Sequence, residues 1–475
     1  MRRLIRRKYV ILGTFLCACV HIFRIYTRGF IEDPDVGSFI LLSHSFWSGN
    51  IFYDQFFDPK LPHVLPVYSL SLLSGSIAGH LVVTLFCICA TGWLINLSGK
   101  NIWGGVLYIC LVLLSPGGAT GHLAIFANFL IACSYYSLTR HRSLNPQSLL
   151  RNGALVWLAI SAFFAGWAIG LRPNYGFALI PLSLWFIWQQ KLHIQRALIW
   201  SFCCIVTVLG PILGAVQHAK VNTSDLYELF RSWNRFFYSH VGVSDSAEKI
   251  VQMYAHPVGP FTLGTLVLFV TLSFFYSTSR ASLQKVVPFA FALSFLWFSY
   301  LVTHTYNHYI LMDLLIVSLL ISSVNTRSHS IFLYAVTGVL WSALLLSPSN
   351  PHSDSDSLII KNQREVLSWV INNNEEQVVS PMWLTPHWVQ RNEVPTKGIH
   401  PEWSIGLLDR FGFKRLSVVK KFGLDVDWSS QCSRWEENAS VFIASQWLFD
   451  KCRFKNFLEV SQFSGYPLKV WKKRL

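Results

Sequence analysis

Long runs of apolar residues constrain this chain more than any other feature. A helix needs about 20 predominantly apolar residues to cross the hydrocarbon core of a bilayer, and 52% of the 475 residues are hydrophobic while only 13% are charged. Soluble chains carry about 25% charged residues. We therefore predict a mainly α-helical, polytopic transmembrane bundle of about 11 spans. The predicted spans are 9–27, 79–98, 102–117, 119–138, 153–171, 174–190, 197–216, 259–278, 287–303, 308–324 and 331–347.

Two further apolar segments differ from an ordinary internal span. Residues 63–77 are interrupted by Pro62, Pro66 and Gly75, which favours a shorter or re-entrant piece over a full span. The N-terminal apolar run follows a cluster of arginines and continues toward Tyr26 without a small-residue cleavage site. This pattern indicates a first transmembrane helix, with its basic end in the cytoplasm, rather than a signal peptide.

The distribution of charge predicts the topology. The formal net charge is +15, but the basic residues form short clusters at the ends of apolar runs, which argues against a nucleic-acid-binding surface. With the N-terminus inside, the connections predicted to be cytoplasmic carry lysine or arginine and contain no acidic residue, as the positive-inside rule requires. An odd number of spans places the C-terminus on the extracytoplasmic side.

The sequence changes character near Pro348. Residues 349–475 are polar and contain no spanning run, so we predict a transmembrane module over 1–348 and a small extracytoplasmic α/β domain over 349–475. Strands are expected near 378–380 and 440–444, and a helix over 358–371. Cys432 and Cys452 lie in this second domain, where they form either a disulfide or two free thiols.

The first outer loop, residues 28–62, is unusually acidic. It contains Glu32, Asp33, Asp35, Asp54 and Asp58. A solvated loop with Pro34 and Gly37 as turn residues is one alternative for Asp33 and Asp35, but it does not explain the return of acids at Asp54 and Asp58. The later acids stand among aromatic residues that favour the membrane interface. Carboxylates held there are suited to accepting a proton or positioning a cation.

The same loop resembles that of a known family. Asp35-Val36-Gly37 follows the first span, then come Trp-Ser-Gly-Asn at 47–50, Tyr53-Asp54, Phe57-Asp58 and Lys60-Leu61-Pro62. This order is similar to the first outer loop of GT-C glycosyltransferases, in particular bacterial enzymes like protein O-mannosyltransferases and aminoarabinose transferases. The sequence departs from the family pattern at Val36, where a Glu is usual, and at Leu61, where a Pro is usual.

The resemblance implies roles for the acids of the loop. Asp35, with Asp33 as the next candidate, is implied to be the general base that deprotonates the acceptor. Asp54 and Asp58 are implied to position the loop and the acceptor, and Lys60 to contact the phosphate of the donor.

Two further outer turns extend the resemblance. Arg172 lies in the turn 170–176, where related enzymes place a Lys or Arg before a Pro-containing helix. Arg172 either extends to the membrane interface or clamps a lipid phosphate, whose geometry a guanidinium matches. His308-Tyr309 resembles the family's His-Tyr before a late helix, which implies that this pair contacts the lipid phosphate of the donor. His308 is either a phosphate or leaving-group donor or an interfacial polar residue.

Two other features remain open in the sequence. The outer loop 217–258 contains an amphipathic stretch in which Arg231 and Arg235 share a helical face. These arginines either contact lipid phosphates or only keep the helix soluble. Asp313 lies within a predicted span, where an acid is either functional or held by a structural partner such as a hydroxyl group.

The resemblance implies a membrane glycosyltransferase with a polyprenyl-phosphate-linked sugar donor and an extracytoplasmic protein, glycan or lipid acceptor. It implies single inverting displacement without a cofactor, although a divalent metal is not excluded. The sequence contains no Walker A motif or other glycine-rich phosphate loop, which fits a lipid-linked donor. The alternatives are a transporter or flippase, disfavoured by the scarcity of charges within the spans, and a polysaccharide polymerase or ligase of cell-envelope assembly.

Overall fold

The structure is a computed structural model of the whole chain. The residues that it describes are 2–28, 34–47, 61–72, 77–99, 101–115, 118, 121–143, 152–189, 193–219, 224, 248, 251, 280–302, 309–323, 330–346, 362, 365–366, 368–370, 372–373, 378–379, 432–433, 435–437, 439–463 and 468–474.

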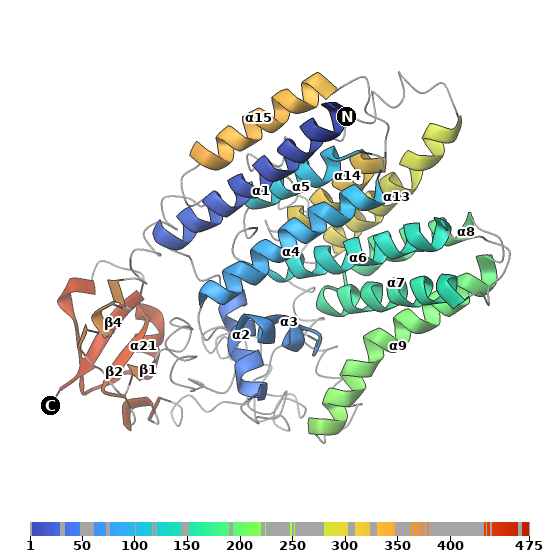
Figure 1. The fold of residues 1–475 in the computed structure, drawn as a ribbon. Coiled ribbons are helices and arrows are strands. Elements are labelled where there is room, and N and C mark those ends of the chain that lie inside the picture. Colours follow the sequence, from blue (N-terminus) through green and yellow to red (C-terminus); the bar gives the residue numbers. More distant parts are fainter. Residues whose placement is uncertain are drawn as a thin grey trace. The chain divides into compact units, whose positions relative to one another are not determined.

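Helices dominate the first three quarters of the described chain, and strands occur only after residue 377 among the described residues (Figure 1). The helices are α1 (Arg2–Arg28), α2 (Pro34–Trp47), α3 (Val64–Leu72), α4 (Ile77–Ser98), α5 (Trp103–Leu114), α6 (Leu123–Ser143), α7 (Asn152–Leu171), α8 (Tyr175–Trp188), α9 (His193–Ala219), α13 (Arg280–Val302), α14 (Ile310–Ser323), α15 (Ser330–Leu346) and α21 (Gln446–Cys452), with the 3₁₀ helix η4 (Ser461–Phe463). The strands are β1 (Val378–Val379), β2 (Val441–Ser445), β3 (Phe457–Glu459) and β4 (Leu468–Lys473).

The predicted spans are confirmed as helices wherever the structure describes them. Only the span predicted at 259–278 lies outside the described residues. By length and composition, four described helices are able to cross a membrane, and further apolar helices are shorter. The four are Lys8–Ile25, Gly79–Ser98, Gly153–Leu171 and Ile194–His218. In the described part of residues 63–77, the short helix α3 precedes the first residue of α4, in agreement with the shorter piece that the prolines favour.

The chain forms two compact units, which are described separately. The first comprises Met1–Arg24, Leu81–Leu213 and Asn234–Pro351, and the second comprises Ile25–His80, Gly214–Trp233 and His352–Leu475. The division into domains 1–348 and 349–475 stays a prediction.

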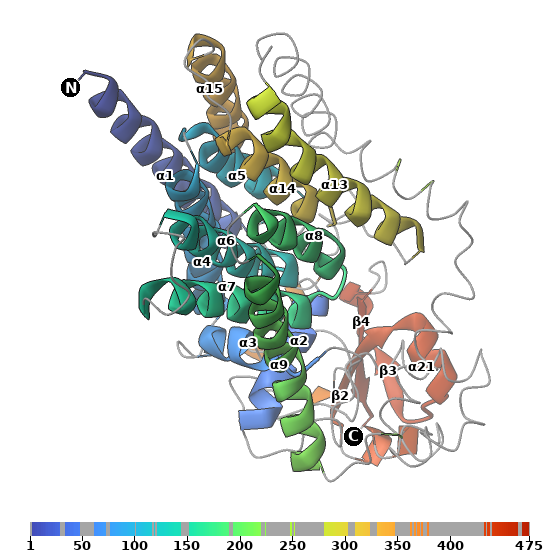
Figure 2. The ribbon, with the colours of Figure 1, turned by 90° about the vertical axis from the view of Figure 1, so that its right-hand side faces the viewer.

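In the first unit, the helices pack side by side as a bundle (Figures 1 and 2). Helix α6 lies along α7, α8 packs against α13, and α5 packs against α14 and α15. Two glycines let α5 approach its neighbours closely. A Cβ atom at Gly105 would lie 2.1 Å from the carbonyl oxygen of Gly92 in α4, and one at Gly104 would lie 2.2 Å from that of Ser318 in α14. Such contacts between small residues allow helix backbones to meet within a membrane.

Helix α14 is the buried centre of this unit, because its residues from Ile310 to Ser322 are all buried. Its C-terminal end is held by Asn101, whose side-chain nitrogen donates to the carbonyl oxygen of Ile321 at 2.8 Å and of Ser322 at 3.3 Å. The Asn101 oxygen accepts the backbone N–H of Trp103 at 2.9 Å. The amide therefore satisfies carbonyl groups that a helix leaves open at its end.

In the second unit, part of the predicted outer loop 28–62 is helical. Helix α2 begins at Pro34, and proline is favoured at the first position of a helix because its missing N–H is not needed there. Val36, Phe39 and Ile40 are buried at helical spacing. The Phe39 ring lies 5.3 Å from that of Tyr68 in α3, so the apolar face of α2 rests on α3.

The C-terminal sheet has the strand order β1-β2-β4-β3. Strands β1 and β2 are parallel, whereas β4 is antiparallel to both β2 and β3. The strands expected near 378–380 and 440–444 are therefore confirmed. Residues of the expected helix 358–371 are helical where they are described, at 362, 365–366 and 368–370.

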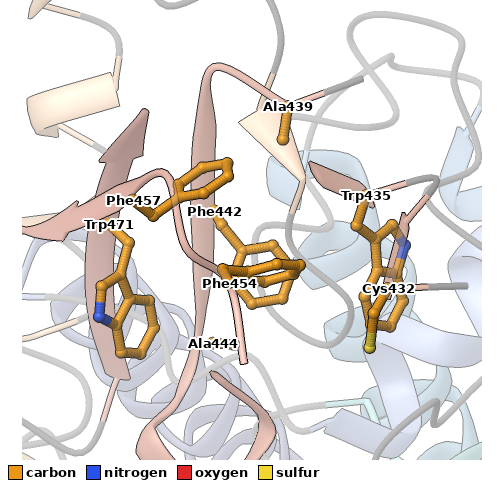
Figure 3. Close-up of a cluster of buried hydrophobic side chains, with 8 residues drawn as sticks. All are labelled: Cys432, Trp435, Ala439, Phe442, Ala444, Phe454, Phe457 and Trp471. Atoms are coloured by element: carbon orange, nitrogen blue, oxygen red, sulfur yellow. The ribbon is translucent and has the colours of Figure 1, made fainter. Parts of the chain in front are cut away.

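Both faces of this sheet are covered by apolar side chains. On one face Phe442 of β2 packs edge to face on Phe454, with ring centroids 4.7 Å apart, and Trp471 lies beside them (Figure 3). Phe449 of α21 stacks on Trp471 at 4.1 Å. On the other face Val441, Ile443 and Val470 pack with Val366 and Val370. The sheet thus separates two small cores, as alternation along each strand requires.

A disulfide joins Cys432 to Cys452, at the edge of the aromatic core. The sequence left this pairing open. The two cysteines are separated by 20 residues, and closing a loop of that length stabilises a fold by about 3 kcal/mol.

We expect Cys452→Ser to lower the stability of the sheet by about that amount. Hydrogen exchange at the amides of β2 and β4 would measure the loss. The control is Cys203→Ser, which removes a free cysteine in α9. Unchanged protection in Cys452→Ser would contradict a stabilising role for the disulfide.

Candidate functional site

Three ends of helices in the first unit bring a cationic cluster together. Arg172 lies between α7 and α8, His122 immediately precedes α6, and Tyr309 immediately precedes α14. All three side chains are buried. We call these three residues the arginine cluster.

The turn that carries Arg172 is fixed from both sides. The N–H of Arg172 makes the last bond of α7, to the carbonyl oxygen of Ala168 at 2.9 Å. Pro173 follows, and proline does not continue a helix because it lacks an N–H. The carbonyl oxygen of Arg172 accepts the N–H of Tyr175 at 3.0 Å, at the start of α8. Arg172 therefore sits on a short, rigid connection rather than on a long loop.

His122 owes its place to the residue before it. Gly121 has a φ of 76°, a left-handed conformation that glycine adopts without steric cost. This turn leads the chain directly into α6. The backbone N–H of Ala124 lies 3.4 Å from Nδ1 of His122, so the imidazole lies near a backbone donor in the first turn of the helix.

The guanidinium of Arg172 contacts both partners. Its Nη2 atom lies 3.0 Å from Nδ1 and 2.9 Å from Nε2 of His122. A guanidinium can only donate hydrogen bonds, so the ring nitrogen that accepts from it carries no proton. Arg172 also lies over the Tyr309 ring, 5.2 Å from the centroid, where the ring face attracts a cation. These contacts orient the positive charge of Arg172 between the ends of three helices.

Asp313 lies one turn into α14. The Tyr300 hydroxyl is 3.2 Å from Oδ1 of Asp313 and 3.2 Å from the carbonyl oxygen of Tyr309. The rings of Tyr300 and Tyr309 are 5.3 Å apart. A hydroxyl partner for Asp313 was one of the two alternatives left open by the sequence. Through Tyr300, α13 meets both the buried acid and the residue that supports Arg172.

Asn128, one and a half turns into α6, connects the neighbouring helices. Its side-chain nitrogen donates to the carbonyl oxygen of Leu311 at 2.8 Å and to the Tyr108 hydroxyl at 3.1 Å. Its side-chain oxygen accepts the hydroxyl hydrogen of Tyr175. Both donor hydrogens and the acceptor of this buried amide are thus engaged. The amide joins α5, α8 and α14 beside the arginine cluster.

The structure unites some of the predicted site residues. Arg172 and Tyr309, both predicted to contact a lipid phosphate, lie in the arginine cluster, and Asp35 is the second residue of α2. The predictions that fall outside the described residues are those for Asp33, Asp54, Asp58, Lys60, Arg231, Arg235 and His308.

Sequence reasoning did not identify His122 or Asn128. His122 follows a glycine at the start of a predicted span and lies at the same predicted end of the bundle as Arg172. That position is the one sequence signal that could have marked His122 as a candidate site residue. The contact itself joins residues 50 apart in the chain, and no spacing rule connects them.

The cluster is suited to binding an anion. A buried guanidinium forms strong bidentate bonds to phosphate oxygens, and removal from water strengthens each of these interactions. Among the described residues, no group of three or more His, Cys, Asp and Glu side chains is placed to hold a metal ion.

The chain is similar in fold to the crystal structure of ArnT from Cupriavidus metallidurans bound to undecaprenyl phosphate. The match covers 98% of each chain, with a TM-score of 0.56 and 11% sequence identity. No model of a known protein family matches this sequence, and no curated protein matches it either. The likeness confirms the predicted fold, a mainly α-helical polytopic membrane bundle like that of ArnT, and the structure adds the small C-terminal sheet.

Proposed function

We propose that this protein is an integral membrane glycosyltransferase that moves a sugar from a polyprenyl-phosphate carrier to an acceptor. The observation that carries the proposal is the arginine cluster, a buried guanidinium held by His122 and Tyr309 where three helix ends meet. It supports an anion site in a chain whose fold resembles that of ArnT, which was solved with undecaprenyl phosphate. A phosphate on a lipid is the anion best suited to such a site within a membrane protein.

The proposed reaction is a single displacement at the anomeric carbon. An acceptor oxygen attacks this carbon while Asp35 takes the acceptor's proton. The bond between the anomeric carbon and the phosphate oxygen breaks, and its electron pair leaves with the polyprenyl phosphate. The configuration of the sugar is therefore inverted.

Arg172 and His122 have the complementary role in this proposal. As the carbon–oxygen bond breaks, negative charge grows on the phosphate, and donors that are already oriented stabilise it without reorganising. Tyr309 holds the guanidinium in place through its ring. Lys60 and His308 are proposed to add further donors, while Asp54 and Asp58 are proposed to position the acceptor.

The side of the membrane is also part of the proposal. The lysine and arginine distribution supports a cytoplasmic N-terminus, and we propose that the arginine cluster and the C-terminal sheet are extracytoplasmic. The acceptor is then an extracytoplasmic protein, glycan or lipid.

The test is release of polyprenyl phosphate from a panel of polyprenyl-phosphate sugars by the purified protein in lipid. Membrane extract would serve as the acceptor source, with and without added divalent metal. We expect release from at least one donor, dependent on the acceptor. No release from any donor under these conditions would contradict the proposal and favour a transporter or a non-catalytic relative.

A further inference from the structure

The buried amide of Asn128 occupies an unusual position relative to the arginine cluster. It touches none of the three residues of the cluster through the hydrogen bonds described above. Its hydrogen bonds go instead to the carbonyl oxygen of Leu311 and the hydroxyl of Tyr175, which are close in sequence to Tyr309 and Arg172. Leu311 is two residues after Tyr309, and Tyr175 is three residues after Arg172.

These bonds connect the two halves of the cluster. The 2.8 Å bond to the Leu311 carbonyl oxygen holds the first turn of α14, which carries the Tyr309 ring. The bond from the Tyr175 hydroxyl holds the first turn of α8. The backbone N–H of the same tyrosine donates to the carbonyl oxygen of Arg172. One side chain thus links the start of α14, next to the Tyr309 ring, to the start of α8, next to Arg172.

We infer that Asn128 is a positioning residue that sets the geometry of the phosphate site through Tyr175 and the start of α14. The inference rests on the proposed function, because it concerns affinity for a lipid phosphate. Replacing the amide leaves the charge of Arg172 intact but frees the two helix starts to shift. Displacements of about 1 Å are enough to weaken a preorganised site strongly.

Asn101, which immediately precedes α5, provides a matched control because it bonds the other end of α14. It is also a buried asparagine, and it also donates to a carbonyl oxygen of α14 at 2.8 Å, but at the C-terminal end of that helix. Asn101→Leu and Asn128→Leu therefore remove comparable bonds from the two ends of α14. A merely structural role predicts similar consequences for both.

The experiment measures the dissociation constant of undecaprenyl phosphate for the full-length protein in lipid nanodiscs, together with the melting temperature of each variant. We expect Asn128→Leu to raise the dissociation constant about 10-fold or more, the effect of losing one or two buried hydrogen bonds. Tyr175→Phe, which removes only a hydroxyl group, should change it in the same direction. Asn101→Leu should lower the melting temperature comparably while the dissociation constant stays within about twofold of wild type.

The outcomes are separable. Equal effects of Asn128→Leu and Asn101→Leu on lipid affinity would overturn the inference. If Asn128→Leu does not fold, Tyr175→Phe decides instead, and an unchanged lipid affinity in that variant would overturn the inference. Wild-type protein that neither binds undecaprenyl phosphate nor releases it from a donor would instead refute the proposed function. The inference is supported if wild type and Asn101→Leu bind undecaprenyl phosphate with similar affinity while Asn128→Leu and Tyr175→Phe bind it more weakly.

Discussion

Asp35→Asn is expected to lower sugar transfer by about 100-fold to 10,000-fold, the usual contribution of a positioned general base. The amide has nearly the same size as the carboxylate but does not accept a proton from the acceptor. The backbone of α2 should be retained, because the buried residues Val36, Phe39 and Ile40, which pack it on α3, are unchanged. Turnover measured as polyprenyl phosphate release, at a matched amount of folded protein, tests this expectation.

Two further variants make the result specific. Asp450→Asn removes an exposed carboxylate of α21 that accepts a hydrogen bond from Gln446, and it should leave turnover within about twofold of wild type, as exposed pairs contribute little. Asp33→Asn examines the second acid predicted from the sequence. Near-normal turnover in Asp35→Asn, accompanied by a large loss in Asp33→Asn, would transfer the role of base to Asp33.

Arg172→Gln is expected to lower turnover by about 100-fold to 1,000-fold, the effect of removing one oriented donor from a developing oxyanion. The glutamine still donates hydrogen bonds but has no charge. Arg172→Lys restores the charge without the planar fork of donors, so its turnover should lie between those of wild type and Arg172→Gln. Steady-state kinetics with a defined polyprenyl-phosphate sugar would measure both.

Arg140 is the natural comparison for Arg172. It also lies over a tyrosine ring, 5.1 Å from the Tyr136 centroid, and donates to the Tyr136 hydroxyl at 2.7 Å. It is located near the opposite end of α6 from His122, and its contact is exposed. Arg140→Gln should therefore leave turnover nearly unchanged. Equal losses in Arg140→Gln and Arg172→Gln would indicate a general effect of removing a positive charge from the bundle.

The bundle could be predicted from the sequence because hydrophobic length is a local property. A run such as 153–171 identifies itself as a helix that spans a membrane, whatever its neighbours are. Strand β2 could likewise be predicted from a local property, because it is a short apolar run, and its alternating residues lie in two different cores. Arg172 and Tyr309 were accessible for another reason, since each stands at a turn between apolar runs and matches a family pattern.

Contacts between residues far apart in the chain could not be predicted from local sequence properties. Helix α2 was hidden because acidic and turn residues around Asp35 outweighed the buried spacing of Val36, Phe39 and Ile40. The contact of His122 with Arg172 depends on how α6, α7 and α8 pack together. The pairing of Cys432 with Cys452 likewise depends on a tertiary distance, which the 20-residue separation does not determine.

The most direct test of the central claim is a cryo-electron microscopy structure of the wild-type protein in nanodiscs containing undecaprenyl phosphate. We expect density for the phosphate about 3 Å from the Arg172 guanidinium, with His122 beside it and Tyr309 still beneath the guanidinium. Phosphate density at another place, with Arg172 making no contact to it, would contradict the account, as would the absence of bound lipid in a sample that releases undecaprenyl phosphate from its donor.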